Sequence, residues 1–515
     1  MVGIDELAAA RAELTRLEKQ EQQLLQHLLD VRAALKTQRS KIDALIRERN
    51  CTISRLPAEL LVRIFSYFLS DYLDLVHPRR QLLASVSRCW RDIILDSPML
   101  WEYIALSPFD DFFSLKTQLE KSRDVLLDVV ITGWSNWHVD DMKEPLDIII
   151  NSADRWRSLT IGANAARCTA LIIAEINKNK FPSLQHVVVE GLGALVLADN
   201  PPIPRFLSST SSPALEDLSI GSFTAPPGFL PPSKLKALQL TFQNDAHLRL
   251  FPPICVSSSQ SLTILSLSGS TNNWLLERDC VTFPALRSLI LSVTEPRYIV
   301  AAIVTPMLES FSYSSKDVDV SDSVVFGGLG NKFNTVRRLS FGFHNDFRRF
   351  DHACGVALCQ AFCDARTVEI KADDVHSLFS SDALGPLGPQ CYPLDNFNDL
   401  ESIAVSCSDS KWLEPEGLGG LDSFVEWLTN RIESGRGRLR VKLKDITYVA
   451  LEDKFTALYN QLRRCCILEL NDIMIAPMMC FSTSDHFPFQ MVSASSCSVG
   501  FLTWIPFVDN ITRNV

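Results

Sequence analysis

The sequence predicts an α/β protein with three structured parts: a long N-terminal coiled-coil helix, a compact group of three helices, and an irregular solenoid of short strands. Three patterns lead to this class. Apolar residues recur in sevens over residues 5–48, helix-spaced apolar runs fill residues 53–105, and a short strand pattern returns from residue 107 onward. The predicted parts are the coiled-coil helix at 1–50, the group of three helices at 51–106, the solenoid at 107–475 and a C-terminal capping tail at 476–515.

The bulk composition is that of a globular protein. A chain of 515 residues is too long for one hydrophobic core, so several domains are expected. The net charge of −10 argues against general nucleic-acid binding, which depends on neutralising phosphates with Lys and Arg. The first residues carry acids and no apolar run, which predicts no secretory signal. The longest apolar stretches are far shorter than the ~20 residues of a membrane helix, so we expect no membrane association. Because no export signal is predicted, we expect the 14 cysteines to be reduced thiols in the cytoplasm or nucleus.

Residues 5–48 carry a heptad repeat. With Leu7 at position a, ten of twelve a and d positions are apolar, and the segment contains no Gly or Pro. The residues predicted to form a self-association seam are Leu7, Leu14, Leu17, Leu24, Leu28, Val31, Leu35, Ile42 and Leu45. Glu21 and Gln38 interrupt this seam and would fix its register. The strict period of seven favours a coiled coil, with a homo-oligomer among the outcomes, over a single helix packed on its own protein.

Residues 53–105 are predicted to form three short helices. Pro57 suits a first helical turn, and Glu59 lies where the helix dipole favours an anion. The apolar face of this first helix consists of Leu60, Leu61, Ile64, Phe65 and Phe68. A second helix is expected over 79–95, and a third begins at Pro98 with Ser97 as its N-cap. Three short helices can bury only a modest hydrophobic core. We therefore expect another protein to cover part of their apolar surface. The alternative is a self-contained helical bundle.

Four dipeptides in this segment occur in a characteristic order: Leu56-Pro57, Ile64-Phe65, Trp90-Arg91 and Leu100-Trp101. Over residues 54–104, about a tenth of the chain, this order resembles the F-box family. The segment departs from the family pattern at Ser87, where a Cys is frequent, and in a somewhat long link after the first helix. The resemblance implies docking on a Skp-type adaptor, which holds the receptor on a cullin ubiquitin ligase.

The resemblance also assigns roles by position. It implies that Leu56, Pro57, Leu60, Ile64 and Phe65 contact the adaptor or brace that contact. Trp90 and Trp101 would mostly support the fold around these residues.

A pattern of apolar-x-x-apolar-x-apolar recurs after residue 107. Its first positions are Leu184, Leu215, Leu235, Leu262, Leu286, Leu308 and Val336. Gaps of 20 to 31 residues and this spacing are typical of a leucine-rich repeat, with one strand per turn. The usual capping Asn is replaced by Gln243, Ser270 or Thr294 in the clearest turns and by other residues elsewhere, which predicts an irregular solenoid; a non-repeating α/β domain is the alternative. The outward-facing row is predicted to be Val188, Ser219, Gln239, Ser266, Ile290, Ser312 and Ser340, an uncharged set suited to a peptide or protein.

Motifs of catalysis and cofactor binding do not occur in the sequence. The Gly-rich segments at 191–196 and 327–332 miss both dinucleotide and phosphate-loop spacing. The best metal candidate, His352, Cys354, Cys359 and Cys363, lacks the close pairs of zinc sites, and its cysteines fit a buried helix face better. We therefore expect no metal, no cofactor and no enzymatic activity.

Together these features predict a substrate receptor of a Skp–cullin–F-box ubiquitin ligase. It would self-associate by the heptads, bind the adaptor through the F-box-like segment and capture a target protein on the solenoid. The order of parts resembles F-box proteins of fungal type. One alternative is a coiled-coil and leucine-rich-repeat scaffold without a ubiquitin-ligase role. The other, an enzyme on an α/β core, is disfavoured by the missing motifs.

Overall fold

A computed structural model covers the chain, which divides by internal contacts into Met1–Ile473 and Met474–Val515. The described residues are 2–50, 53, 56–70, 76–108, 112–135, 139–162, 166–190, 203–222, 232, 234–242, 253–271, 274, 276–315, 325–330, 332–343, 352–372, 376–379, 392–406, 418–444 and 454–470. The predicted capping tail at 476–515 therefore lies outside them.

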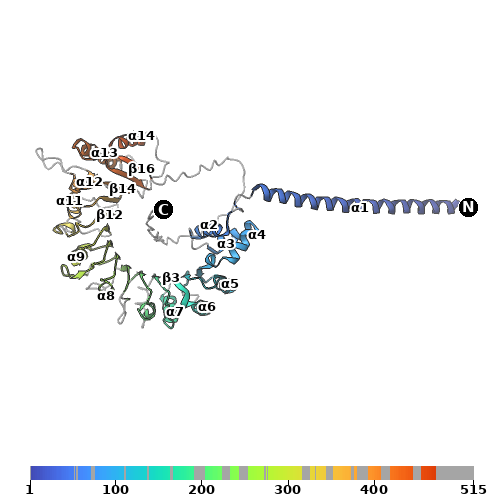
Figure 1. The fold of residues 1–515 in the computed structure, drawn as a ribbon, viewed down its shortest axis with the longest axis horizontal. Coiled ribbons are helices and arrows are strands. Elements are labelled where there is room, and N and C mark those ends of the chain that lie inside the picture. The colour runs from blue at the N-terminus through green and yellow to red at the C-terminus, as the bar shows by residue number, and fades with distance from the viewer. Residues whose placement is uncertain are drawn as a thin grey trace. The chain divides into compact units, whose positions relative to one another are not determined.

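The heptad segment is one continuous helix, α1 (Val2–Asn50), shown in blue in Figure 1. Ala, Leu, Glu, Gln, Lys and Arg dominate its sequence, and these residues have high helix propensity. The side chains described in α1 are all exposed, including eight of the nine predicted seam residues: Leu7, Leu14, Leu17, Leu24, Leu28, Val31, Leu35 and Ile42. The side chain of the ninth, Leu45, lies outside the described set. The predicted long helix is present, and its coiled-coil pairing stays a prediction.

The next segment is helical, with one difference from the prediction. Its described elements are α2 (Ala58–Ser70), α3 (Val76–Val86), α4 (Arg88–Asp96) and the 3₁₀ turn η3 (Pro98–Trp101). The predicted single helix over 79–95 is two helices, because Ser87 is extended and its side chain accepts a hydrogen bond from Trp90 N. Ser97 precedes Pro98 as expected, but its backbone oxygen, rather than its hydroxyl, accepts the bond from Leu100 N (3.1 Å).

These helices enclose a small core of their own. Its buried members are Leu61, Phe65, Leu69, Leu83, Ile94, Leu100 and Trp101. Half-buried Tyr103 packs against this cluster, whereas Ile104 belongs to the larger core under the sheet. The chain therefore passes from one core to the other within two residues.

The rest of the described chain is a long parallel sheet. Among the described residues it has 14 strands, hydrogen-bonded in chain order from β1 at one edge to β16 at the other, without closing into a barrel. Its strands are β1 (Tyr103–Leu106), β2 (Leu127–Thr132), β3 (Trp156–Gly162), β4 (His186–Val189), β5 (Asp217–Ile220), β6 (Ala237–Phe242), β7 (Ile264–Gly269), β9 (Ser288–Val293), β11 (Ser310–Ser315), β12 (Arg338–Phe343), β13 (Thr367–Ala372), β14 (Ser402–Ser406), β15 (Arg440–Lys444) and β16 (Ile467–Leu470). A separate pair joins β8 (Val281–Thr282) and β10 (Ile303–Val304).

Return segments between the strands cover one face of the sheet. The described helices there are α5 (Phe112–Ser122), α6 (Lys143–Ile150), α7 (Ala166–Ile176), α8 (Pro253–Ser257), α9 (Pro296–Ala302), α11 (His352–Ala361), α12 (His376–Phe379), α13 (Leu418–Glu433) and α14 (Lys454–Cys465), with short 3₁₀ turns η5 (Asp140–Met142), η6 (Ala153–Arg155), η8 (Arg205–Leu207) and η9 (Pro393–Asn396). Figure 1 shows α5 to α9 on one side of the strands. Successive side chains of a strand alternate between faces, so each strand sends half of its side chains toward these helices.

The repeat pattern marks the buried face correctly. Each predicted first position, from Leu184 to Val336, is at most 2% exposed. The sheet also extends beyond the repeat positions named above at both ends: β1 to β3 precede them, and β13 to β16 continue the same order. Longer return helices such as α11 and α13 separate the last strands, which explains the frayed spacing in the sequence.

Candidate functional site

Helix α2 has one face inside its domain and another outside it. Leu61, Phe65 and Leu69 follow each other at intervals of four and are buried, with exposures of 1%, 1% and 6%. Their neighbours Leu60 and Ile64 are each 47% exposed, although both are apolar. The amphipathic pattern of α2 therefore supplies more apolar surface than its own core uses.

A stacked arginine continues the exposed stripe onto α3. Phe68 follows Ile64 by four residues, and the Arg79 guanidinium carbon lies 4.8 Å from the centre of its ring. The same arginine donates to the Phe68 carbonyl oxygen at 2.6 Å. Leu82 and Val86, which are 59% and 58% exposed, follow Arg79 by three and seven residues and so share its side of α3. We call this set the docking face: Leu60, Ile64, Phe68, Leu82 and Val86.

Aromatic contacts hold the docking face from below. The rings of Phe65 and Trp90 lie 4.7 Å apart at an interplanar angle of 56°. Trp101 donates its indole N–H to the Ile94 carbonyl oxygen at 2.7 Å, which ties the turn η3 to the end of α4. Trp90 thus supports α2 from within the domain, and Trp101 supports the turn η3 beside it.

Arg80 is an unusual member of this core. Its side chain is only 3% exposed, and its guanidinium carbon lies 4.1 Å from the centre of the Trp101 ring. Among the described residues, none of its three guanidinium nitrogens has a hydrogen-bond partner. Burial lowers the pKa of Arg80 to about 10, because the charged form is poorly solvated there. The attraction between cation and ring compensates for part of this cost.

The predicted adaptor-binding residues fall into two groups. Pro57, Leu60 and Ile64 are exposed, and Leu56 is half-buried. Phe65 and Trp101 are buried in the domain core, and Trp90 is half-buried beside Phe65. Pro57 also begins the first turn of α2, since its carbonyl oxygen accepts from Leu60 N and Leu61 N. Only the exposed group can touch a partner without rearrangement of the domain.

Sequence reasoning left three docking-face residues out of the predicted adaptor contacts: Phe68, Leu82 and Val86. Phe68 belongs to the predicted apolar face of the first helix, and Leu82 and Val86 are four residues apart in the second, so this i, i+4 spacing is a usable signal. What the sequence does not reveal is that Arg79 joins the two helices at Phe68, since no residue spacing encodes a contact across eleven positions.

The sheet offers a second surface, opposite its helices. The predicted outward row is continuous in the strand register, from Val188 through Ser219, Gln239, Ser266, Ile290 and Ser312 to Ser340. The same register extends the row to Ala105, Val130 and Thr160 on one side and to Glu369, Ala404, Lys442 and Glu469 on the other. The row is uncharged through Ser340 and gains charge only beyond it.

A polar cluster borders this row at β2 to β5. Arg157 pairs with Asp128 and, at 3.3 Å, with Glu102. His186 Nδ1 lies 2.6 Å from Asp217 Oδ2, and this hydrogen bond raises the pKa of His186. The cluster is half-exposed and its members satisfy one another, so it reads as a brace between strands.

The described residues show no other arrangement with evident chemistry. They hold no group of three or more His, Cys, Asp or Glu side chains placed to bind a metal ion. Of the metal candidate considered above, Cys359 is buried with a pKa raised by burial, and Cys363 lies beyond the end of α11 at Ala361. The side chains of His352 and Cys354 lie outside the described residues. No described helix is both long and apolar enough to cross a bilayer.

Comparison with known families agrees with the helical segment. Residues 53–107 match the family model described as F-box-like. A search of curated proteins finds no match to the chain. The match spans α2, α3, α4, η3 and β1, and therefore the whole docking face with its supporting core. Residues 53–107 thus form an F-box-like domain, a class of domain that generally binds Skp-type adaptors.

Proposed function

We propose that this protein is the substrate-recognition subunit of a Skp–cullin–F-box ubiquitin ligase. The observation that carries the proposal is the docking face on the F-box-like domain, with Leu60 and Ile64 each 47% exposed beside a complete internal core. Buried neighbours already stabilise α2, so this surface is available for a partner. A Skp-type adaptor is the partner that the domain class favours, and the adaptor would in turn connect the protein to a cullin.

The proposed mechanism is proximity rather than catalysis by this chain. The receptor would hold a target protein close to the ubiquitin-charged enzyme and so raise the effective concentration of the target's lysines. No residue of the receptor needs to take part in a chemical step. A protein of this kind acts in the cytoplasm or nucleus, where its cysteines stay reduced.

The target is proposed to bind the outward face of the sheet. Fourteen described strands hydrogen-bonded in chain order support a leucine-rich-repeat-like solenoid. The uncharged row from Ala105 to Ser340 suits a peptide or protein surface better than a phosphate, which would require Arg and Lys. The exposed seam of α1 supports self-association as a further property of the receptor.

Adaptor binding by the full-length protein tests the proposal. We expect the native chain to bind a purified Skp-type adaptor in calorimetry, and Ile64→Glu to weaken binding by roughly 100-fold or more, as for a central interface residue. Met307→Glu is the matched control, because Met307 is 51% exposed and lies in a turn outside the domain. Both variants should keep the native circular dichroism spectrum. A folded native chain that ignores the adaptor would favour the scaffold without a ubiquitin-ligase role.

A second experiment separates the ligase from adaptor binding alone. The chain, the adaptor and a cullin should co-elute as one complex in size-exclusion chromatography. The Ile64→Glu variant should elute separately from the adaptor and the cullin. If the chain binds the adaptor but displaces the cullin, the protein uses the adaptor for another purpose.

A further inference from the structure

The seam of α1 contains information on the direction of its partner helix. The residues at its a and d positions are exposed along the helix, from Leu7 at 55% to Ile42 at 46%. An exposed apolar stripe of this length is stable only when another helix covers it. The present inference rests on the proposed self-association of the protein and concerns how two copies are oriented.

The polar residues of the seam favour one alignment. In a parallel pair each a residue meets its own counterpart, so Glu21 would face a second Glu21 between apolar layers, with a cost from like charges. In an antiparallel pair, a positions face d positions. The alignment that sets Glu21 opposite Gln38 also sets Leu17 opposite Ile42, Leu24 opposite Leu35, and Leu28 opposite Val31. Glu21 then accepts from the Gln38 amide, and the other layers named are apolar.

Shifting the antiparallel pair by one heptad removes this match. Glu21 would then face Val31 or Leu45, and Gln38 would face Leu14 or Leu28. Each of these shifts buries two polar groups without partners, which is the main cost in such seams. The register with Glu21 opposite Gln38 is therefore strongly preferred.

The charges beside the seam point the same way. In the antiparallel register Glu18 lies across from Arg39, and this pair occurs twice by symmetry. In the parallel register Glu18 would instead face Glu13, and Arg39 would face Ala34. The side chains of Glu18 and Arg39 are exposed, so neither is committed to a core. One contact opposes the antiparallel arrangement, because Glu13 would lie across from a second acidic residue, Glu48.

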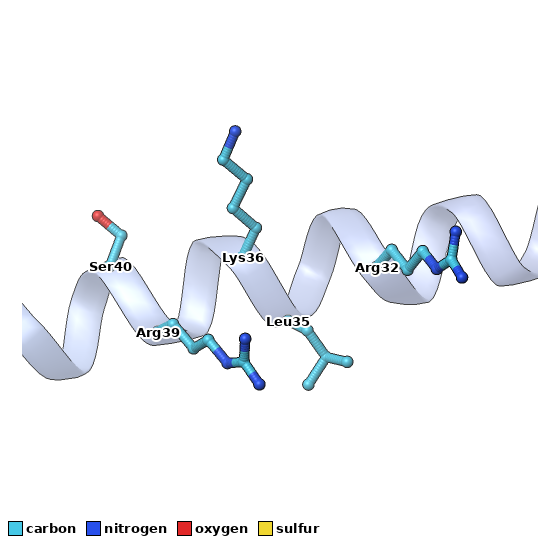
Figure 2. A pocket seen from close by; sticks show the side chains of 5 residues that line it. All are labelled: Arg32, Leu35, Lys36, Arg39 and Ser40. Atoms are coloured by element: carbon cyan, nitrogen blue, oxygen red, sulfur yellow. The ribbon is translucent and has the colours of Figure 1, made fainter.

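Figure 2 shows the basic half of this surface. Arg32, Leu35, Lys36, Arg39 and Ser40 line a shallow groove on α1. Leu35 and Arg39 project to one side of the helix, whereas Lys36 and Ser40 project to the other. Arg39 thus stands beside the seam residue Leu35, where an acidic side chain of a partner helix can reach it. Lys36 points away and offers a matched control.

We propose that α1 pairs with α1 of a second copy of this chain as an antiparallel coiled coil in which Glu21 faces Gln38 and Glu18 faces Arg39. The occupant of the seam is the same protein, because its own acidic N-terminal and basic C-terminal halves complement each other. A helix of 49 residues is about 73 Å long at 1.5 Å per residue. The chain after Asn50 consequently leaves the two helices at opposite ends of the pair.

Charge reversal in the full-length protein tests this orientation through the dimer dissociation constant, measured by sedimentation equilibrium. Glu18→Arg and Arg39→Glu should each raise it roughly tenfold, since two pairs change from attraction to repulsion. The double variant restores both pairs and should return to within about twofold of the native value. Asp30→Arg and Lys36→Glu, which make the same charge changes away from the seam, should have little effect.

The outcomes distinguish orientation from association. A monomeric native chain at tens of micromolar would overturn self-association and this inference together. A dimer that Glu18→Arg tightens, with Arg39→Glu neutral, would be parallel and would overturn the orientation alone. As an independent readout, a photo-reactive p-benzoylphenylalanine at position 38 should cross-link to the tryptic peptide around Glu21 of the other copy. Cross-linking to the region of residue 38 itself would contradict the antiparallel register.

Discussion

The guanidinium of Arg80 lies over the indole ring of Trp101, 4.1 Å from carbon to ring centre, and is almost fully enclosed by the F-box-like domain. The contact places a positive charge in a core otherwise built from apolar side chains. Replacing Arg80 should therefore change the stability of the domain differently from replacing an arginine on the surface.

Replacing this arginine by methionine should stabilise the domain. Lowering the pKa of Arg80 from 12.5 to about 10 corresponds to roughly 3 kcal/mol of lost solvation, against about 2 kcal/mol for a desolvated cation–ring contact. We expect Arg80→Met to raise the free energy of unfolding by about 1 kcal/mol, measured by denaturant titration. The exposed Arg88→Met should change it by less than about 0.5 kcal/mol. A clear loss of stability in Arg80→Met would show that the ring contact outweighs the burial of charge.

The two faces of α2 should separate stability from binding. Leu61→Ala creates a cavity at a side chain that is 1% exposed and should lower the free energy of unfolding by ~2–5 kcal/mol. Ile64→Ala removes atoms from a side chain that is 47% exposed and should lower it by about 1 kcal/mol or less. Thermal denaturation and adaptor calorimetry on the same samples check both, and Ile64→Ala should lose more affinity than stability. Equal destabilisation by the two variants would mean that Ile64 is core.

Gly269 should not tolerate a side chain. It ends β7 with a φ of +102°, and a Cβ built on it would lie 1.9 Å from the Phe242 carbonyl oxygen of the neighbouring strand. Gly269→Ala should therefore lower the free energy of unfolding by ~2 kcal/mol or more, through backbone strain and displacement of β6. Gly437→Ala is the control, because a Cβ there meets no atom within 4 Å. If the two variants had nearly the same denaturant midpoint, this account of the β6–β7 contact would be contradicted.

His186 should titrate above its ordinary value. Its hydrogen bond to Asp217 favours the protonated ring, so the pKa of His186 in the folded protein lies above 6.5. The stabilisation is fully present below pH 6.5 and is lost as the pH rises through the raised value, by the sign of proton linkage. Both partners are partly exposed, so the effect on stability is at most about 1 kcal/mol and weakens with salt. NMR titration should show the pKa of His186 falling toward 6.5 in Asp217→Asn; an unchanged pKa would rule out the pair.

Periodicity accounts for the parts of the fold that the sequence predicts well. The heptad of α1, the apolar stripe of α2 and the repeat positions from Leu184 to Val336 all appear where their spacing places them. The outward row succeeds for the same reason, since strand side chains alternate strictly. Spacing alone, however, gives α2 one apolar face where the structure has two, because burial depends on which helices pack against it.

Contacts between distant residues explain what the sequence does not predict. Ser87 divides one expected helix by a local cap, a signal present in the sequence but weaker than the apolar spacing around it. The burial of Arg80 depends on Trp101 and has no local signature, since an arginine in a polar-looking helix is normally solvated. The strands β1 and β2 lack the leucine pattern and are recognisable only by their pairing in the sheet, β1 with β2 and β2 with β3.

The strand order has a consequence for how the chain reaches its native state. The described strands of the long sheet are hydrogen-bonded in chain order, so a nascent polypeptide can add each one to those already made. Tyr103 touches the core of the F-box-like domain and β1 follows directly, which makes that domain the natural template for the first pairing. Synthesis from the N-terminus would then extend the sheet from a folded end, and β16 would be the last of the described strands to join it.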